Sequence, residues 1–233
     1  MSNQKNKIGL LVIATNKYIH FLNNLIYTAD LYFCKDSDVT FFIFTDKKIE
    51  INNNISHKII NVEHKPWPWM TLGRYKIFTD AADQLSSMDY LFYCDVDMKF
   101  VSNVGLEILG DRVATQHPGY VNKRGTPETN PKSLAYVRDD EHMIYFAGGF
   151  NGGTTAEFLK MSKTLSNNID IDFSNNIIAI WHDESHINRY FIDNPPTKIL
   201  DFSYCYPESW PNLYSQHTQK IIALNKDHAS IRS

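Results

Sequence analysis

The sequence predicts an α/β protein built around a largely parallel β-sheet, and two observations lead to this fold class. Continuous apolar runs at residues 8–14 and 39–44 are typical of strands that are buried on both faces. Between them, residues 21–33 carry apolar side chains at helical spacing. A strand, a helix and a second strand in this order form a right-handed βαβ unit, in which the two strands run parallel.

The next elements continue this pattern toward a pair of acidic residues. Residues 58–62 are predicted as a third strand. Pro66 and Pro68 prevent a helix from starting early, and the apolar spacing that follows predicts a helix over residues 72–85. Residues 90–94 are rich in aromatic side chains, which favour strands, and we predict a buried strand there.

The second half of the chain is less regular. We predict a short helical turn at residues 103–109 and a short strand at 113–116. Residues 117–133 are rich in Pro, Gly, Asn and Thr and are predicted to form a long mobile loop. Long loops in compact domains are usually functional or disordered, so we expect this one to border the site. The remaining patterns predict a helix at residues 156–165 and strands at residues 177–181 and 221–224.

Length, composition and charge restrict the functional classes. The 233 residues contain neither an internal repeat nor an interdomain linker, which predicts a single α/β domain. The formal net charge of −3 argues against a protein that binds nucleic acid electrostatically. Three cysteines without a C-x-x-C pair support neither a disulfide framework nor a thiolate zinc site. No apolar stretch approaches the roughly 18 residues of a membrane span, and we expect a soluble, cytoplasmic protein.

Asp95 and Asp97 follow the predicted strand at residues 90–94 and are the first candidate site. In an extended segment, residues two apart point to the same side, so the two carboxylates would lie together at the carboxyl end of the strand. Two adjacent carboxylates repel each other unless a cation lies between them. A hard divalent ion such as Mg²⁺ is commonly held by one or two carboxylates and substrate phosphates. The alternative interpretation is a solvated acidic turn.

A second polar cluster, residues 182–186, follows the predicted strand at 177–181. His182 and His186 are four residues apart and would share one face of a helix, which is compatible with metal ligation. The alternative is that both histidines hold a loop by hydrogen bonds. Glu184, between them, is a candidate nucleophile or charge stabiliser, because it is a carboxylate in a polar turn after a buried segment.

The ordered motifs resemble the family 6 glycosyltransferases, which include the ABO blood-group transferases and the α-1,3-galactosyltransferases. The resemblance extends from about residue 8 to 232, and it is closest to the short bacterial or phage members. Its motifs are the acidic Asp95-Val96-Asp97 segment, the 104–109 segment, His117-Pro118-Gly119-Tyr120, Gly148-Gly149-Phe150 with Gly152-Gly153, Trp181-His182-Asp183-Glu184-Ser185-His186, and Pro196-Thr197-Lys198-Ile199-Leu200.

The resemblance implies a GT-A type fold that binds a nucleotide-sugar. It implies a nucleotide- and metal-binding half at about residues 8–110 and an acceptor and catalytic half at about 111–233. Asp95 and Asp97 match the pair that binds Mn²⁺, with Mg²⁺ as the alternative ion, on the donor diphosphate. The residues matched to UDP-sugar binding are Ala14, Thr15, Tyr18, Arg74, Val96, Ala147, Gly148, Gly149, Asp183, Lys226 and Arg232.

Catalysis and acceptor binding are assigned by the same resemblance. Glu184 matches the glutamate at the β-face of the donor sugar. His117 and Trp181 match acceptor contacts, and Glu208 and Trp210 are further candidates in a segment that departs from the vertebrate sequences. The small residues near the donor sugar favour UDP-GalNAc over UDP-Gal.

The expected activity is retaining, Mn²⁺-dependent transfer of GalNAc or Gal in α-1,3 linkage to a galactoside in an oligosaccharide or glycan. The chemistry is coherent without the family, since a carboxylate opposite the leaving group can stabilise or attack an oxocarbenium-like sugar. The alternatives are a metal-dependent nucleotidyl or phosphoryl transferase and a non-catalytic sugar-binding module.

Overall fold

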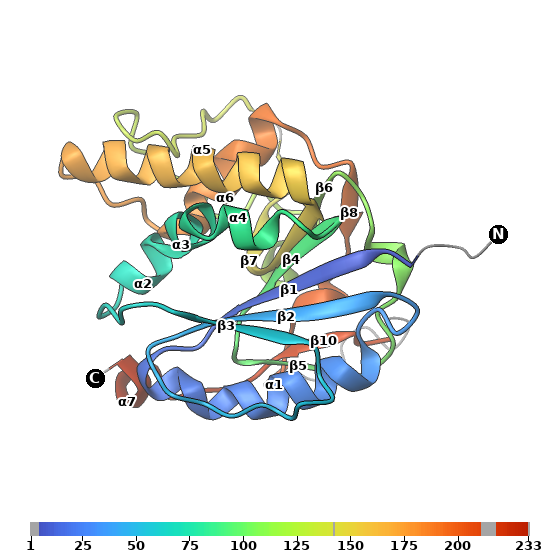
Figure 1. Ribbon diagram of the computed structural model, residues 1–233. Helices are drawn as coiled ribbons and strands as arrows, with labels where there is room; N and C mark the ends of the chain where they lie inside the picture. The colour runs from blue at the N-terminus through green and yellow to red at the C-terminus, as the bar shows by residue number, and fades with distance from the viewer. Residues whose placement is uncertain (1–4, 142, 211–217, 233) are drawn as a thin grey trace.

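A seven-stranded sheet forms the centre of the computed structural model, which describes residues 5–141, 143–210 and 218–232, with the side chain of Arg232 outside that description. Its strand order is β3-β2-β1-β4-β7-β6-β8 (Figure 1). The strands are β1 (Lys7–Ile13), β2 (Asp38–Thr45), β3 (His57–Asn61), β4 (Tyr90–Cys94), β6 (Arg112–Gln116), β7 (Phe146–Thr154) and β8 (Lys198–Leu200).

The sheet is mostly parallel, which confirms the predicted fold class. Strands β3, β2, β1 and β4 pair in parallel, as do β6 and β8. Only β7 runs antiparallel to its neighbours β4 and β6 among these strands. This arrangement brings the carboxyl ends of β1 and β4 to the same edge of the sheet, where α/β proteins generally bind their ligands.

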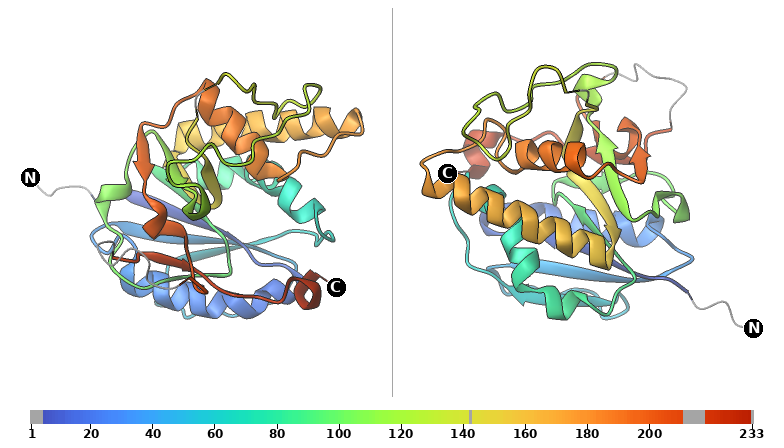
Figure 2. Two further views of the ribbon diagram at one scale, coloured as in Figure 1. Left: turned by 180° about the vertical axis from the view of Figure 1, so that it is seen from behind. Right: turned by 90° about the horizontal axis from the view of Figure 1, so that it is seen from above.

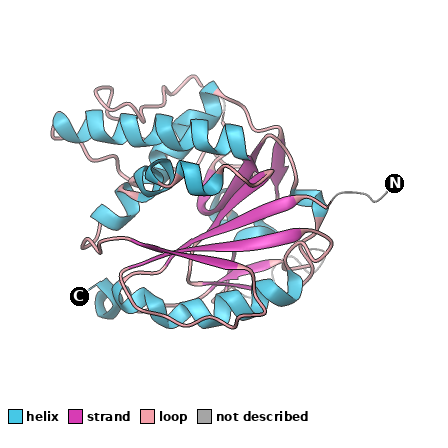
Figure 3. Ribbon diagram, viewed as in Figure 1, coloured by secondary structure: helices cyan, strands magenta, loops and turns pink. Residues whose placement is uncertain are grey.

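Helices cover both faces of the sheet (Figure 3). Helix α1 (Ile19–Tyr32) packs on one face through Leu22, Leu25 and Ile26. The opposite face is covered by α3 (Arg74–Asp80), α4 (Ala82–Leu85), α5 (Thr155–Ser174) and α6 (Asp183–Asp193), with the short α2 (Trp69–Leu72) before them. Figure 2 shows the long α5 and the neighbouring α6 lying across this face. Alternate β1 side chains enter the two cores, because successive residues of a strand point to opposite faces.

A second, three-stranded sheet brings the carboxyl-terminal segment to the acidic residues. It consists of β5 (Met98–Phe100), β10 (Ile221–Ala223) and β9 (Tyr206–Pro207). Strand β10 pairs antiparallel with β5, which directly follows Asp97. The chain then ends in the described part with α7 (His228–Arg232), and Lys17 Nζ donates to the carbonyl of Ser230 at 2.9 Å. The tail is therefore held beside the carboxyl end of β1.

Three predicted elements differ from the structure. The helix expected at residues 72–85 is divided into α2, α3 and α4, with breaks at Gly73 and Ala81. The strand expected at 177–181 is wrong: residues 177–179 are irregular, residues 180–181 begin a turn, and Ile178 and Ile180 are exposed. The strand before the acidic pair ends at Cys94, so Asp95 and Asp97 lie in a turn and not in an extended segment.

The helix expected at residues 156–165 is longer in the structure, since α5 continues to Ser174. The other predicted elements agree within a few residues. The loop at residues 117–133 is irregular apart from a 3-10 turn at Pro118–Tyr120 and an isolated β-bridge between Glu128 and Tyr136. In the described residues, no helix combines the length and the apolar character needed to cross a membrane.

Candidate active site

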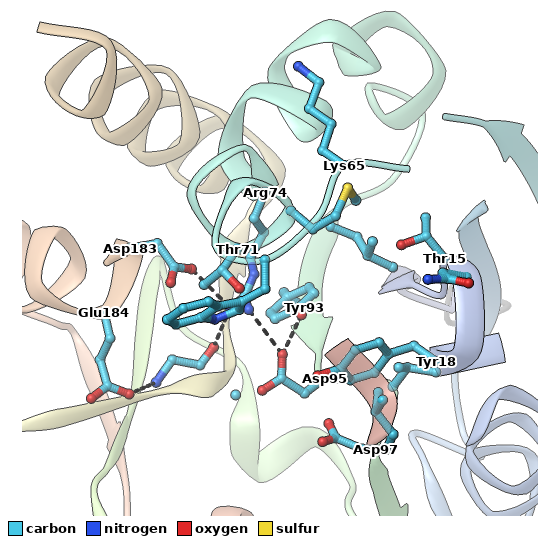
Figure 4. Close-up of a pocket in the computed structure, with 18 of the residues that line it drawn as sticks. Thr15, Tyr18, Lys65, Thr71, Arg74, Tyr93, Asp95, Asp97, Asp183 and Glu184 are labelled. Carbon is cyan, nitrogen blue, oxygen red and sulfur yellow. Dashed lines mark hydrogen bonds and ion pairs between the residues drawn. The ribbon is translucent and has the colours of Figure 1, made fainter. Parts of the chain in front are cut away.

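A pocket of about 280 Å³ opens at the carboxyl ends of β1 and β4 (Figure 4). Its walls come from segments far apart in the sequence: the turn after β1, helix α3, the acidic turn, strand β7, the start of α6 and the tail. Predicted site residues that line it are Thr15, Tyr18, Arg74, Asp95, Val96, Asp97, Gly148, Gly149, Trp181, Asp183, Glu184 and Lys226.

Arg74 connects three of these walls. One guanidinium nitrogen lies 3.2 Å from Asp95 Oδ1, and the other lies 3.1 Å from Asp183 Oδ2 and donates to the carbonyl of Gly148 at 3.2 Å. The guanidinium also lies 4.3 Å from the centroid of the Tyr93 ring. A planar group with five donors suits this bridging position, because it satisfies several acceptors in fixed directions. Arg74 therefore sets the relative positions of α3, β7 and α6 around the pocket.

Asp183 is buried, at 3% exposure, and its charge is balanced by Arg74. Burial raises the pKa of Asp183 to about 6, while the nearby guanidinium opposes that shift. The carboxyl is thus ionised at neutral pH and forms an ion pair on the floor of the pocket.

Glu184 lies in the first turn of α6. Its Oε2 accepts a hydrogen bond from the backbone N–H of Gly148 at 2.9 Å, which directs the carboxylate toward β7 and the pocket. Burial raises the pKa of Glu184 to about 7, and the negative charge of Asp183 adds to the shift. A partly dehydrated carboxylate of this kind interacts strongly with a positive charge that develops next to it.

The two acidic residues of the turn have different partners. Asp95 is half-buried and is bound by Arg74 and by the hydroxyl of Tyr93. Asp97 is buried at 5% exposure and forms an ion pair with Lys226 on the tail. The backbone N–H of Leu224 also donates to the carbonyl of Asp97 at 2.8 Å. Both carboxylates reach the same pocket although the turn gives them separate surroundings.

These residues fit a divalent cation that brings its own further ligands. Asp97 already forms an ion pair with the ammonium of Lys226, so a bound metal ion would share this carboxylate with the lysine or displace it. Within the described ranges, no group of three or more His, Cys, Asp or Glu side chains is arranged to hold a metal. The protein therefore offers two carboxylates, and a bound ion would complete its shell with phosphate oxygens and water, as Mg²⁺-type ions commonly do.

Glycines 148 and 149 keep the β7 wall of the pocket close to the acidic groups. A Cβ atom on Gly149 would lie 2.5 Å from Met98 Cε and 3.1 Å from Asp95 Oδ2, so a larger residue does not fit without movement. A Cβ on Gly148 would lie 3.5 Å from Glu184 Oε2. Strand β7 thus passes near the pocket without side chains at these two positions.

Some predicted site residues lie behind the pocket wall. Ala14 and Ala147 are buried and do not line the cavity. Arg232 belongs to α7, but the prediction for its side chain falls outside the described residues.

The remaining predicted acceptor residues do not line this pocket. His117 accepts from the N–H of Gly119 and packs on Tyr120 and Tyr145, and burial lowers its pKa. Glu208 is exposed and binds Lys99 at 3.1 Å. Trp210 packs on the ring of Tyr206. The structure thus brings Trp181 to the pocket but does not join these three residues to it.

The two histidines of the second polar cluster have separate partners. The ring of His182 packs on Trp67, with centroids 5.1 Å apart. His186 is buried at 2% exposure, and its Nε2 lies 3.5 Å from Asp172 Oδ2. Burial lowers the pKa of His186 to about 4, so the ring is neutral. This arrangement supports the interpretation in which the histidines hold the local structure.

Several pocket residues were not predicted as site residues from the sequence, among them His64, Lys65, Trp67 and Tyr93. His64 Nδ1 lies 3.0 Å from Thr15 Oγ1, and its Nε2 lies 3.4 Å from the side-chain amide of Asn16. The signal for Tyr93 was present, since it precedes the acidic pair by two residues. Nothing local in the sequence distinguishes His64, because its partners belong to a distant turn.

Comparison with known proteins places this pocket in a family. The family model for glycosyltransferase family 6 matches residues 1–233. The chain is 34% identical to the histo-blood group ABO system transferase 1 of Rattus norvegicus, over 99% of this chain and 70% of the rat protein. It is 32% identical to the globoside alpha-1,3-N-acetylgalactosaminyltransferase 1 of Homo sapiens, over 97% of this chain and 68% of the human protein. It is 29% identical to the O-antigen biosynthesis glycosyltransferase WbnI of Escherichia coli, over 96% of both chains.

The matched length, the ordered motifs and the α/β architecture agree with one another, and the chain belongs to glycosyltransferase family 6.

Proposed function

We propose that this protein is a retaining glycosyltransferase that moves N-acetylgalactosamine or galactose from a UDP-sugar to a galactoside in α-1,3 linkage. The observation that carries the proposal is that Glu184 lines the same pocket as Asp95 and Asp97. The name of the human relative, a globoside alpha-1,3-N-acetylgalactosaminyltransferase, supports the sugar class and the linkage.

The acidic turn and the tail bind the diphosphate in this proposal. Asp95 and Asp97 would hold a Mn²⁺ or Mg²⁺ ion, which acts as a Lewis acid toward the leaving UDP. Lys226 lies beside them and supplies a further positive charge. Fixed cations at the position where negative charge develops stabilise the transition state more than they stabilise the ground state. The turn that contains Thr15 and Tyr18 forms the uridine end of the pocket.

Glu184 acts on the sugar in this proposal. As UDP departs, positive charge develops at the anomeric carbon and the ring oxygen. A carboxylate on the opposite face either stabilises that charge or forms a bond to the carbon that the acceptor later breaks. In both routes the acceptor hydroxyl attacks from the face that UDP leaves and gives its proton to the departing phosphate, so the configuration is retained. The hydrogen bond from the Gly148 N–H keeps the carboxylate in one orientation, and the Arg74–Asp183 ion pair holds the adjacent turn of α6.

The donor sugar would lie along the glycines of β7. A methyl group on Gly148 would be in ordinary van der Waals contact with Glu184 and Arg74, so the glycine leaves room for only about one small group there. The small residues at positions 147–149 support UDP-GalNAc as the donor. On the acceptor side, Trp181 is 46% exposed at the pocket rim, and its indole face is available to pack on a sugar ring. The acceptor contact of His117 remains a prediction from the resemblance, and Glu208 and Trp210 remain candidates in a segment that departs from the vertebrate sequences.

The test is a donor and product screen. The protein is incubated with Mn²⁺, methyl β-galactoside and each of UDP-Gal, UDP-GalNAc, UDP-Glc and UDP-GlcNAc. We expect UDP release and an α-1,3-linked disaccharide whose anomeric configuration is read by NMR, with loss of activity on chelation. Release of pyrophosphate or a nucleoside monophosphate would indicate nucleotidyl or phosphoryl transfer. Sugar binding without any turnover would indicate a binding module.

A further inference from the structure

A buried carboxylate, Glu128, lies outside the pocket, in the irregular segment between β6 and β7. It is 6% exposed. Its Oε1 accepts the backbone N–H of Asn130 at 2.7 Å, and its Oε2 accepts the backbone N–H of Ile180 at 2.7 Å. Within the described ranges, no Lys or Arg forms an ion pair with it. A buried carboxylate is costly unless it is hydrogen-bonded, so these two backbone donors determine where Glu128 lies.

The bond to Ile180 acts directly on the position of Trp181. Ile180 is the residue before Trp181, and its exposed side chain provides little packing of its own. The indole Nε1 of Trp181 donates to Thr126 Oγ1 at 2.7 Å, and Thr126 is only two residues before Glu128. The same short stretch of loop thus holds both the backbone that leads into Trp181 and the ring itself.

The loop is in turn fixed to the helices behind it. Asp172 of α5 accepts the N–H of Leu134 at 2.8 Å and the hydroxyl of Ser133 at 2.5 Å. The carbonyl of Glu128 accepts the N–H of Val137 at 3.0 Å. Because these contacts connect the loop to α5, movement of the loop relative to the 177–181 segment would break buried hydrogen bonds. Glu128 therefore lies between a fixed base and an exposed aromatic ring.

We propose that Glu128 is a positioning residue for the acceptor: it fixes Trp181 against Thr126, so that the indole face is already oriented when the acceptor sugar arrives. This inference rests on the proposed function. Glu128 itself touches neither substrate. An exposed tryptophan held in one orientation loses less conformational entropy when a ligand packs on it than one that rotates freely, and this lowers the cost of binding. Among the described residues, Glu128 forms no hydrogen bond with the groups proposed to bind the donor.

The decisive variant is Glu128→Gln, compared with Glu141→Gln. Glutamine has one acceptor oxygen, so either Ile180 or Asn130 loses its acceptor and faces an amide N–H₂ group. Glu141 is a carboxylate of the same loop, but it binds Arg189 at 2.9 Å and has no bond to the Trp181 segment. Three quantities are measured for each: the KM for methyl β-galactoside, the rate of UDP-sugar hydrolysis without acceptor, and the affinity for UDP by calorimetry.

For Glu128→Gln we expect the acceptor KM to rise about tenfold, the effect of one lost buried hydrogen bond. UDP-sugar hydrolysis and UDP affinity should be unchanged, and Glu141→Gln should leave all three quantities unchanged. In a Trp181→Ala background, Glu128→Gln should raise the acceptor KM no further, because both changes remove the same interaction.

An unchanged acceptor KM, or a parallel loss of hydrolysis and transfer, overturns the proposal. If Glu128→Gln does not fold, Glu128→Asp serves instead, since it keeps the charge but shortens the side chain by one methylene. A wild-type protein that neither transfers nor hydrolyses any UDP-sugar would instead contradict the proposed function.

Discussion

Lys226 and Asp97 form an ion pair in the pocket, although 129 residues separate them in the sequence. The ammonium also lies 5.3 Å from the centroid of the Tyr18 ring. A divalent cation at the acidic turn would need the same carboxylate. In the proposed function, the tail lysine and a metal ion would therefore compete for Asp97, whereas a diphosphate would attract both of them.

Replacing Lys226 should have opposite effects on metal and nucleotide. In Lys226→Met we expect Mn²⁺ to bind more tightly without UDP, because Asp97 has lost its competing cation, and UDP to bind about tenfold more weakly, because one charge-assisted contact is lost. Mn²⁺ binding is measured by electron paramagnetic resonance and UDP binding by calorimetry. Lys99→Met is the control, since Lys99 pairs with Glu208 outside the pocket. Unchanged UDP affinity would remove the tail from the mechanism.

Glu184→Gln should stop turnover while donor binding persists. The glutamine has the same shape, and its oxygen can still accept the Gly148 N–H, but it has no negative charge to place next to the sugar. We expect transfer to fall by about 10³-fold, measured as product formed per enzyme at saturating donor, with UDP affinity within twofold of wild type. A variant with near-normal turnover would exclude Glu184 from the reaction.

The activity should decline in acid as Glu184 takes up a proton. Burial raises its pKa to about 7, and the proposed chemistry needs the ionised form. The kcat should therefore fall as pH decreases through about 7. The asparagine variant Asp183→Asn tests the coupling: because the charge of Asp183 contributes to the raised pKa of Glu184, removing it should move the acid limb of the profile to lower pH. A profile that is flat between pH 5 and 8 contradicts this assignment.

The same raised pKa has a consequence for stability. Between the ordinary pKa of 4.5 and the folded-state pKa of about 7, the folded protein binds a proton at Glu184 that the unfolded chain releases. This contribution to stability is present below pH 4.5 and is lost as the pH rises through 7. Glu184→Gln lacks this titration. The unfolding free energy of the variant minus that of wild type should therefore be larger at pH 8 than at pH 4.5, as measured by urea unfolding at the two pH values.

Arg74→Met should destabilise the fold through Asp183. Removing the guanidinium leaves a carboxyl that is 3% exposed without its ion-pair partner. Breaking a buried pair in this way costs about 3–5 kcal/mol, which is measurable as a lower urea midpoint. The double variant Arg74→Met with Asp183→Asn should recover part of that loss, because the unpaired charge is gone. If the double variant is no more stable than the single one, the ion pair is not the cause.

Local periodicity explains which elements were predictable. Strands β1 and β2 and helix α1 follow directly from apolar spacing, because each is buried by its own amphipathic or fully apolar pattern. Residues 177–181 were not predictable in this way. A short apolar run has the same sequence pattern whether it forms a strand or an irregular segment. Here the backbone N–H of Ile180 donates to the Glu128 carboxylate and not to a neighbouring strand.

The fold class, the strand ends at which the pocket opens, and the acidic and catalytic candidates could be predicted from residue type and from spacing along the chain. The contacts between these groups are visible only in the folded protein: Arg74 meets Asp183, Lys226 meets Asp97, and Glu128 meets the residue before Trp181. Such pairs depend on how the helices and the tail pack on the sheet, and no local pattern encodes a contact between segments so far apart in the chain.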